Sequence, residues 1–245
     1  NFCEQNAPVS VLRGLRDSKD EQGYDQAIWS QIIELGWAGM TIPEDYGGFD
    51  FGYGGLGVVL EETGKTLVSS PLISTVLVGA TAIVQLGNET QKQDLLPKIV
   101  AGELLTALAL DEHTNHNPSK IATTATKVDG GYALNGSKTF VLDGHIANVL
   151  IVAARTSGET IGEQGISLFL VDANAEGLNV VRTIMVDSRN SSNIQFNNVV
   201  VAEDALLGVL DQGFNGLDSV LDIARIGIAA EMLGSMQAVF ESILE

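Results

Sequence analysis

Cysteine is almost missing from this sequence of 245 residues, because Cys3 is the only one. A single thiol excludes an intrachain disulfide and any zinc site built from several cysteines. One cysteine also fits a reducing compartment, and no secretory signal is visible. We therefore expect a cytoplasmic protein.

Basic residues are few: 13 Lys and Arg stand against 31 Asp and Glu, which gives a formal net charge of −18. No cluster of Lys and Arg interrupts this balance, so a nucleic-acid partner is not expected. The same acidity is unfavourable for a polyanionic ligand. Such a ligand would need backbone amides and a few local cations.

Long apolar runs and nucleotide-binding glycine motifs are also missing. The most apolar stretch, residues 71–87, contains Ser74 and Gln85 and is shorter than the ~20 residues that a membrane span needs. We expect a buried helix there and no membrane span. No Gly-x-Gly-x-x-Gly follows a predicted strand, and there is no P-loop, so those nucleotide sites are unsupported.

Metal-ligand patterns are weak. His113 and His116 have a spacing that suits a metal on a helix, but Glu112–His116 has the composition of a loop and no third ligand is evident. We expect no metal site and exposed polar histidines. A surface position is also expected for His145, which follows the turn residues Asp143-Gly144.

The first 106 residues have the spacing of helices. Apolar side chains recur at helical intervals in residues 26–36 and 56–66, followed by the apolar stretch and by a short helix from 88 to 96. Residues 41–49 are rich in turn formers and predict a loop, with Trp37 in the core nearby. The sequence therefore predicts an N-terminal helical domain, residues 1–106.

The periodicity changes after Thr106, and residues 107–207 are typical of an antiparallel β domain, a sandwich or barrel. Asp-Gly and Asn-Gly pairs predict tight turns, including one at Asn135-Gly136. A helical stripe returns at Gly216, so residues 208–245 are expected to begin a C-terminal helical domain that is incomplete here. The strands are expected at 106–110, 122–128, 132–135, 137–142, 149–155, 165–172, 178–182, 193–196 and 199–201.

Five sequence blocks, in order along nearly the whole chain, resemble the acyl-CoA dehydrogenase family. The resemblance implies a helical N-terminal domain, a middle β domain and a C-terminal helical bundle. It also implies FAD, held by the last two domains, and a homo- or hetero-tetramer. The blocks are Leu35–Gly39 with Ile42–Gly48 and Leu60–Gly64, then Leu96–Glu103, Tyr132–Lys138, Gly165–Asp172, and Gly213-Phe214 with Leu221–Arg225.

One segment that the resemblance places against the flavin has altered residues. Asp111-Glu-His113 stands where the family usually has Thr-Glu-Pro. Leu110 and Asp111 would lie against the flavin ring, and Asn117 would lie near the phosphates of a CoA ester. The Asp111 carboxylate would either disfavour an anionic reduced flavin by like-charge repulsion or turn away into solvent.

A second flavin-facing segment, Phe140-Val141-Leu142, stands in place of the usual Trp-Ile-Thr. Phe140 can still pack on the ring. Leu142 lacks the hydroxyl that would bond the flavin N5 edge, so a backbone amide would have to replace it. The alternative is that residues 137–142 are simply a core strand.

The catalytic base is not evident in this chain. The implied reaction removes the α-proton of a thioester while hydride leaves the β-carbon, which needs a desolvated carboxylate. One family position for it lies beyond residue 245, and the other is Ala224, which cannot act as a base. Glu231 lies ~10 Å further along the helix, so we expect the base beyond residue 245.

Two charged residues near Ala224 match family positions at the substrate. Asp222 corresponds to a residue that contacts the pantetheine arm of CoA, and Arg225 to one that braces the site. The alternative is that both are surface charges of a helix.

The resemblance implies an FAD-dependent acyl-CoA dehydrogenase fragment, inactive alone, that belongs to fatty acid β-oxidation. The whole enzyme would convert an acyl-CoA to the 2-enoyl-CoA and pass electrons to an electron-transfer flavoprotein. Two alternatives remain open. One is a non-catalytic structural subunit of a heteromeric acyl-CoA dehydrogenase, and the other is a flavin monooxygenase on the same fold.

Overall fold

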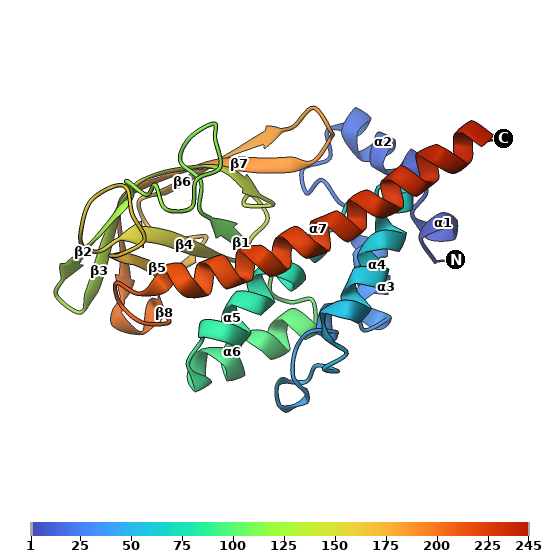
Figure 1. Ribbon diagram of the computed structural model, residues 1–245. Helices are drawn as coiled ribbons and strands as arrows, with labels where there is room; N and C mark the ends of the chain where they lie inside the picture. Colours follow the sequence, from blue (N-terminus) through green and yellow to red (C-terminus); the bar gives the residue numbers. More distant parts are fainter. Residues whose placement is uncertain (1, 245) are drawn as a thin grey trace.

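The computed structural model describes residues 2–244 as a helical part, a β-sheet part and one long final helix (Figure 1). This is the arrangement that the sequence predicts. Short 3-10 turns, η1 (Trp37–Gly39) and η2 (Glu44–Tyr46), lie in the glycine-rich region before α4. The helices of the first part are α1 (Phe2–Asn6), α2 (Val9–Ser18), α3 (Gln26–Glu34), α4 (Gly52–Thr66), η3 (Leu72–Ala80), α5 (Thr81–Leu86) and α6 (Glu89–Val100).

Two helices of this part, α3 and α6, begin at a side-chain cap. Asp25 accepts hydrogen bonds from the amides of Ala27 and Ile28 at 2.8 and 3.1 Å, which satisfies two free donors at the start of α3. Asn88 and Gln91 form a capping box on α6. The apolar stretch is buried as predicted, although it begins as the π-helix η3 before continuing as α5.

The middle part is one eight-stranded sheet in the order β6-β7-β3-β2-β4-β5-β8, with β1 beside β4. Most pairs are antiparallel, but β1 pairs with β4 in parallel, and β2 meets β4 in parallel at Thr124 and Arg155. The sheet is therefore mixed rather than purely antiparallel, because the loop at 110–123 and the β2–β3 hairpin separate β1 from β4. The strands are β1 (Thr106–Ala109), β2 (Thr124–Val128), β3 (Gly131–Leu142), β4 (Val149–Arg155), β5 (Ile166–Asp172), β6 (Leu178–Ile184), β7 (Asn190–Ala202) and β8 (Leu206–Leu207).

The predicted tight turn at Asn135-Gly136 is wrong, because β3 runs unbroken through both residues. Gly136 has a φ of +146°, and a Cβ there would lie 2.5 Å from the hydroxyl of Thr123. The Asn135 side chain accepts a hydrogen bond from the amide of Asn198 on β7 at 2.8 Å. The Asn-Gly pair forms an irregularity in β3–β7 pairing, as a β-bulge does.

The final helix, α7 (Gly213–Leu244), begins at Gly213 rather than at Gly216. It crosses α4 so closely that a Cβ on Gly64 would lie 2.0 Å from the carbonyl oxygen of Glu231. A Cβ on Gly234 would lie 1.8 Å from the carbonyl oxygen of Glu61. Small residues on both helices therefore set the distance between the N-terminal part and α7, which Figure 1 shows in red passing over α4.

The two halves of α7 differ in burial. Its first half is buried against the sheet and the N-terminal helices through Leu217, Val220 and Leu221. Its second half carries large exposed apolar side chains: Met232, Leu233, Met236, Val239, Phe240, Ile243 and Leu244. Of the helices in residues 2–244, α7 alone has the length and composition to cross a bilayer, a test that core helices also pass.

Candidate functional site

The structure brings together the two segments that the sequence places against a flavin. The amide of Thr139 donates a hydrogen bond to the Asp111 carbonyl at 2.7 Å. The ammonium group of Lys138 donates to the Leu110 carbonyl at 2.9 Å. Residues 110–112, which follow β1, therefore lie directly beside Lys138 and Thr139, near the end of β3.

The end of β3 is bulged. Its register with β7 shifts between Lys138 and Val141, and Phe140 adopts a φ of +53°. Phe140 is 49% exposed, whereas Val141 is 1% exposed and packs in the sheet core. Positive φ is uncommon for a bulky residue. The bulge thus presents an aromatic ring at the surface, beside Asp111, while Val141 is a core residue that could contact a ligand only through its backbone.

A buried ion pair lies under these two segments. Lys138 and Glu112 are 2.8 Å apart, and their side chains are 0% and 5% exposed. Glu112 also accepts hydrogen bonds from the amides of Ala122 and Thr123 at 2.7 and 2.9 Å. Each charged group therefore has partners for its polar atoms, as a buried charge requires.

Burial and ion pairing shift the pKa values of these two groups in opposite directions. Burial lowers the pKa of Lys138 to about 8, although the Glu112 carboxylate favours the charged form. Burial also raises the pKa of Glu112, but Lys138 and the hydrogen bonds from Thr123 outweigh it and hold this pKa below its usual range. Sequence reasoning missed the pair, because Lys138 stands between the polar residues Ser137 and Thr139 and shows no local sign of burial.

The Asp111 carboxylate is partly buried and has polar partners. Its two oxygens lie 3.1 and 2.9 Å from Nδ1 of His116. The amide of Asn117 donates to the same carboxylate at 3.4 Å, and the Asn117 side chain accepts hydrogen bonds from Ser119. The loop after Asp111 is therefore folded back on this carboxylate.

The turn after β3 buries a second carboxylate. Asp143, with a φ of +55°, accepts a hydrogen bond from the Ser74 hydroxyl at 2.7 Å. Burial raises its pKa to about 6, while the Ser74 hydrogen bond and nearby Arg189 act in the opposite direction. The predicted surface position of His145 is wrong: this residue is half-buried, and its Nε2 lies 3.1 Å from the Gln22 carbonyl because the 20–23 loop packs against this turn.

The candidate residues on α7 have different environments. Asp222 and Arg225 form an ion pair at 2.5 Å, and both side chains are more than half exposed, at 66% and 51%. Ala224 is 6% exposed. Glu231 is held by Arg189 at 2.5 Å and its side chain is 12% exposed, so its carboxylate is already paired.

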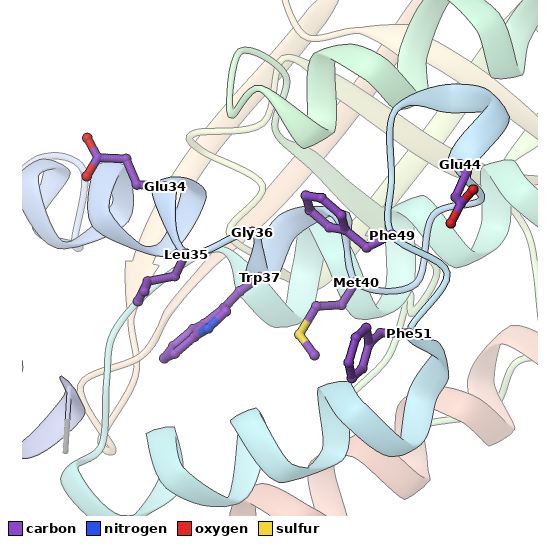
Figure 2. A pocket seen from close by; sticks show the side chains of 8 residues that line it. All are labelled: Glu34, Leu35, Gly36, Trp37, Met40, Glu44, Phe49 and Phe51. Carbon is purple, nitrogen blue, oxygen red and sulfur yellow. The ribbon is translucent and has the colours of Figure 1, made fainter.

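An open pocket of about 490 Å³ lies in the N-terminal part, and Figure 2 shows its side chains. Leu35, Met40, Phe49 and Phe51 supply most of its apolar wall. Trp37, which the sequence placed in the core, is half-buried and lines this pocket. All lining residues fall between 34 and 51, so this pocket is separate from the segments at 110–112 and 138–142.

Comparison with known families identifies the chain. Residues 7–103 match the family described as acyl-CoA dehydrogenase, N-terminal domain, and residues 108–199 match acyl-CoA dehydrogenase, middle domain. These two matches cover most of the chain. The chain therefore belongs to the acyl-CoA dehydrogenase family, as its sequence blocks indicate.

Known relatives agree with this assignment. The chain is 35% identical to "Acyl-CoA dehydrogenase" of Bacillus subtilis (strain 168) over 84% of this chain and 56% of that protein. The acyl-CoA dehydrogenase structure from Geobacillus kaustophilus is 27% identical with a TM-score of 0.87, covering 98% of this chain and 64% of that one. A structure titled for the electron transferring flavoprotein of Acidaminococcus fermentans is 28% identical with a TM-score of 0.84, over 96% and 62%. The chain thus spans less than two thirds of the length of these proteins.

FAD is the cofactor that this family implies, and the residues at the bulge are suited to its ring. Phe140 is half-exposed, so its aromatic ring is available to a ligand. Its positive φ is an uncommon conformation that the surrounding structure must stabilise. Leu110 is 4% exposed and packs in the core, so, like Val141, it could contact a ligand only through its backbone. The neighbouring Asp111 carboxylate is paired with His116. Leu142 offers no hydroxyl, so polar contacts to a ring edge would have to come from the backbone.

Proposed function

We propose that this chain is part of an FAD-dependent acyl-CoA dehydrogenase that converts an acyl-CoA thioester to the 2-enoyl-CoA. One observation carries the proposal. Two segments of the chain, Leu110–Glu112 and Lys138–Leu142, are joined by hydrogen bonds at the bulged end of β3. Phe140 is exposed at this bulge, and the family match covers both segments.

The residues of this chain would bind and orient rather than perform proton transfer. FAD, when bound, would accept the hydride that leaves the β-carbon of the substrate. Phe140 would pack on the flavin, with Leu110, Val141 and Leu142 contributing backbone groups. Asn117 would lie near the CoA phosphates, Asp222 would contact the pantetheine arm, and Arg225 would brace the site.

The base would lie outside this chain. Ala224 has no acidic group, and Glu231 is paired with Arg189. Because a base must reach the α-proton directly or through one water, neither residue is suited to the task. We propose that residues 1–245 alone have no dehydrogenase activity, even with FAD supplied.

The proposed partners follow from the same assignment. Electrons would pass to an electron-transfer flavoprotein, and the subunits would assemble as a homo- or hetero-tetramer. The reaction would serve β-oxidation in the cytoplasm. The net charge of −18 is consistent with a protein that does not bind nucleic acid.

A second candidate is a non-catalytic subunit of a heteromeric dehydrogenase. Two observations favour it: Leu142 lacks the hydroxyl expected at the flavin edge, and Ala224 lacks the acid of one family position. In that case the fold would be retained for assembly, while a partner subunit would supply the reacting groups.

The test is product formation by the natural gene product that contains this sequence. It should be incubated with saturated acyl-CoAs of several chain lengths and an artificial electron acceptor, with mass spectrometry of the CoA esters. The dehydrogenase assignment predicts the 2-enoyl-CoA from at least one of them. No product from any ester, in a folded and flavin-containing preparation, would contradict it.

A further inference from the structure

The least exposed ion pair of the β-sheet part connects the two segments of the candidate site. Lys138 lies at the end of regular β3 pairing, immediately before the bulge that carries Phe140. Its ammonium group contacts both the Leu110 carbonyl and the Glu112 carboxylate, at 2.9 and 2.8 Å. Glu112 in turn accepts from the amides of Ala122 and Thr123. One pair therefore links three stretches of chain at residues 110–112, 122–123 and 138.

Stability alone is a weak explanation for this arrangement. Desolvating two charges is expensive, and well-packed apolar residues of similar volume are often as stabilising as a buried ion pair. Burial lowers the pKa of Lys138 to about 8, because desolvation disfavours the charged amine. What apolar residues could not do is bind the Leu110 carbonyl and fix the 110–112 segment in one register beside β3.

We propose that Lys138 and Glu112 are positioning residues that fix residues 110–112 against the β3 bulge and so shape the surface that receives the flavin. The proposal rests on the function above for the identity of the ligand, but not for the geometry. The Thr139 amide, which donates to the Asp111 carbonyl at 2.7 Å, reports that geometry directly. If the ion pair is lost, this hydrogen bond should open more often.

The first measurement uses the full chain without ligand. Lys138→Met keeps the length of the side chain but removes the ammonium group, and Glu112→Gln keeps an acceptor but removes the charge. Hydrogen exchange of the Thr139 amide is measured by NMR in both variants. The matched control is Lys127→Met, because Lys127 pairs with Glu203 on the surface, with side chains 54% and 65% exposed.

We expect Thr139 exchange in Lys138→Met to be at least about tenfold faster, which corresponds to about 1.4 kcal/mol, because hydrogen bonds to charged groups are among the stronger ones. Glu112→Gln should change it in the same direction by less. Exchange of the Phe169 amide in the core of β5 should stay at the wild-type rate, as should Thr139 in the Lys127→Met control. If Lys138→Met does not fold, Glu112→Gln decides alone. Thr139 exchange at the wild-type rate in every folded variant would overturn the proposal.

The second measurement uses the natural gene product. We expect Lys138→Met and Glu112→Gln to weaken FAD binding at least about tenfold and to shift the visible flavin absorption, whereas Lys127→Met leaves both unchanged. A wild-type protein without flavin would contradict the proposed function, while the exchange result would still decide the geometry. Faster Thr139 exchange with unchanged FAD binding and an unchanged flavin spectrum would overturn the link to the flavin.

Discussion

At the scale of single residues, the chain contains carboxylates whose environments differ far more than sequence indicates. Glu112 and Asp143 are both buried, yet Glu112 has a charged partner whereas the direct partner of Asp143 is the Ser74 hydroxyl. The pairing of Glu112 with Lys138 joins residues far apart in sequence, which local patterns do not predict. The altered positions at Asp111, Leu142 and Ala224 were visible in the sequence because each is a position at which the family resemblance implies a different residue.

Asp143 should make stability depend on pH. Burial raises its pKa from 3.8 to about 6, so the folded state holds this proton more tightly than the unfolded state. The stability contributed by that proton is present below pH 3.8 and is lost as pH rises through 6. Asp143→Asn should therefore be more stable than wild type above pH 6, by up to about 3 kcal/mol.

Urea unfolding across pH 3.8 to 6 tests this expectation, since the advantage of Asp143→Asn should shrink as pH falls. Asn also tolerates the positive φ at this position. Asp129→Asn, at the exposed β2–β3 turn, is the control and should show no such trend. An advantage of Asp143→Asn that does not change with pH would mean that the carboxyl group is not the cause.

Glu231 should matter for the fold but not for proton transfer. In the natural gene product, Glu231→Gln should retain most dehydrogenase turnover, because this carboxylate is bound to Arg189. A true base replaced by an amide should lose about 10²–10⁴-fold in rate. Steady-state kinetics on a preparation with normal flavin content decides the question. A loss of that size would mean that the base lies within this chain.

Among helices and strands, periodicity predicted the long helices and most strands. The turn signal failed at one Asn-Gly pair, because this pair can form either a tight turn or a bulge within a strand. The Asn135-Gly136 pair suits a tight turn, but here Gly136 allows β3 to pass close to Thr123. Neither the parallel pairing of β1 with β4 nor the bulge at Phe140 has a local signature. Both depend on contacts between distant strands.

The crossing of α4 and α7 depends on glycine. Gly64→Ala should destabilise the chain by about 1–3 kcal/mol, because the added methyl group meets the backbone of Glu231. Gly57→Ala is the matched control in the same helix, with nothing within 4 Å of the added carbon. It should be stabilising by about 0.5–1 kcal/mol. Urea unfolding that gives both variants the same stability would refute the close crossing.

At the scale of the whole molecule, the second half of α7 leaves an apolar surface that should promote self-association. Analytical ultracentrifugation of residues 1–245 is expected to show oligomers that weaken when Met236→Glu and Phe240→Glu are combined. These side chains are 59% and 62% exposed. Ile161→Glu, at a 67% exposed apolar position in the loop between β4 and β5, should leave association unchanged. A monomeric wild-type chain at all concentrations would contradict this expectation.

We propose that this chain carries the flavin-facing part of an acyl-CoA dehydrogenase. The visible absorption spectrum of the purified natural gene product, before and after anaerobic addition of saturated acyl-CoAs, tests this claim. We predict a bound flavin whose absorption band bleaches with at least one of these esters. A folded protein that contains no flavin, and cannot be loaded with FAD, would contradict the claim.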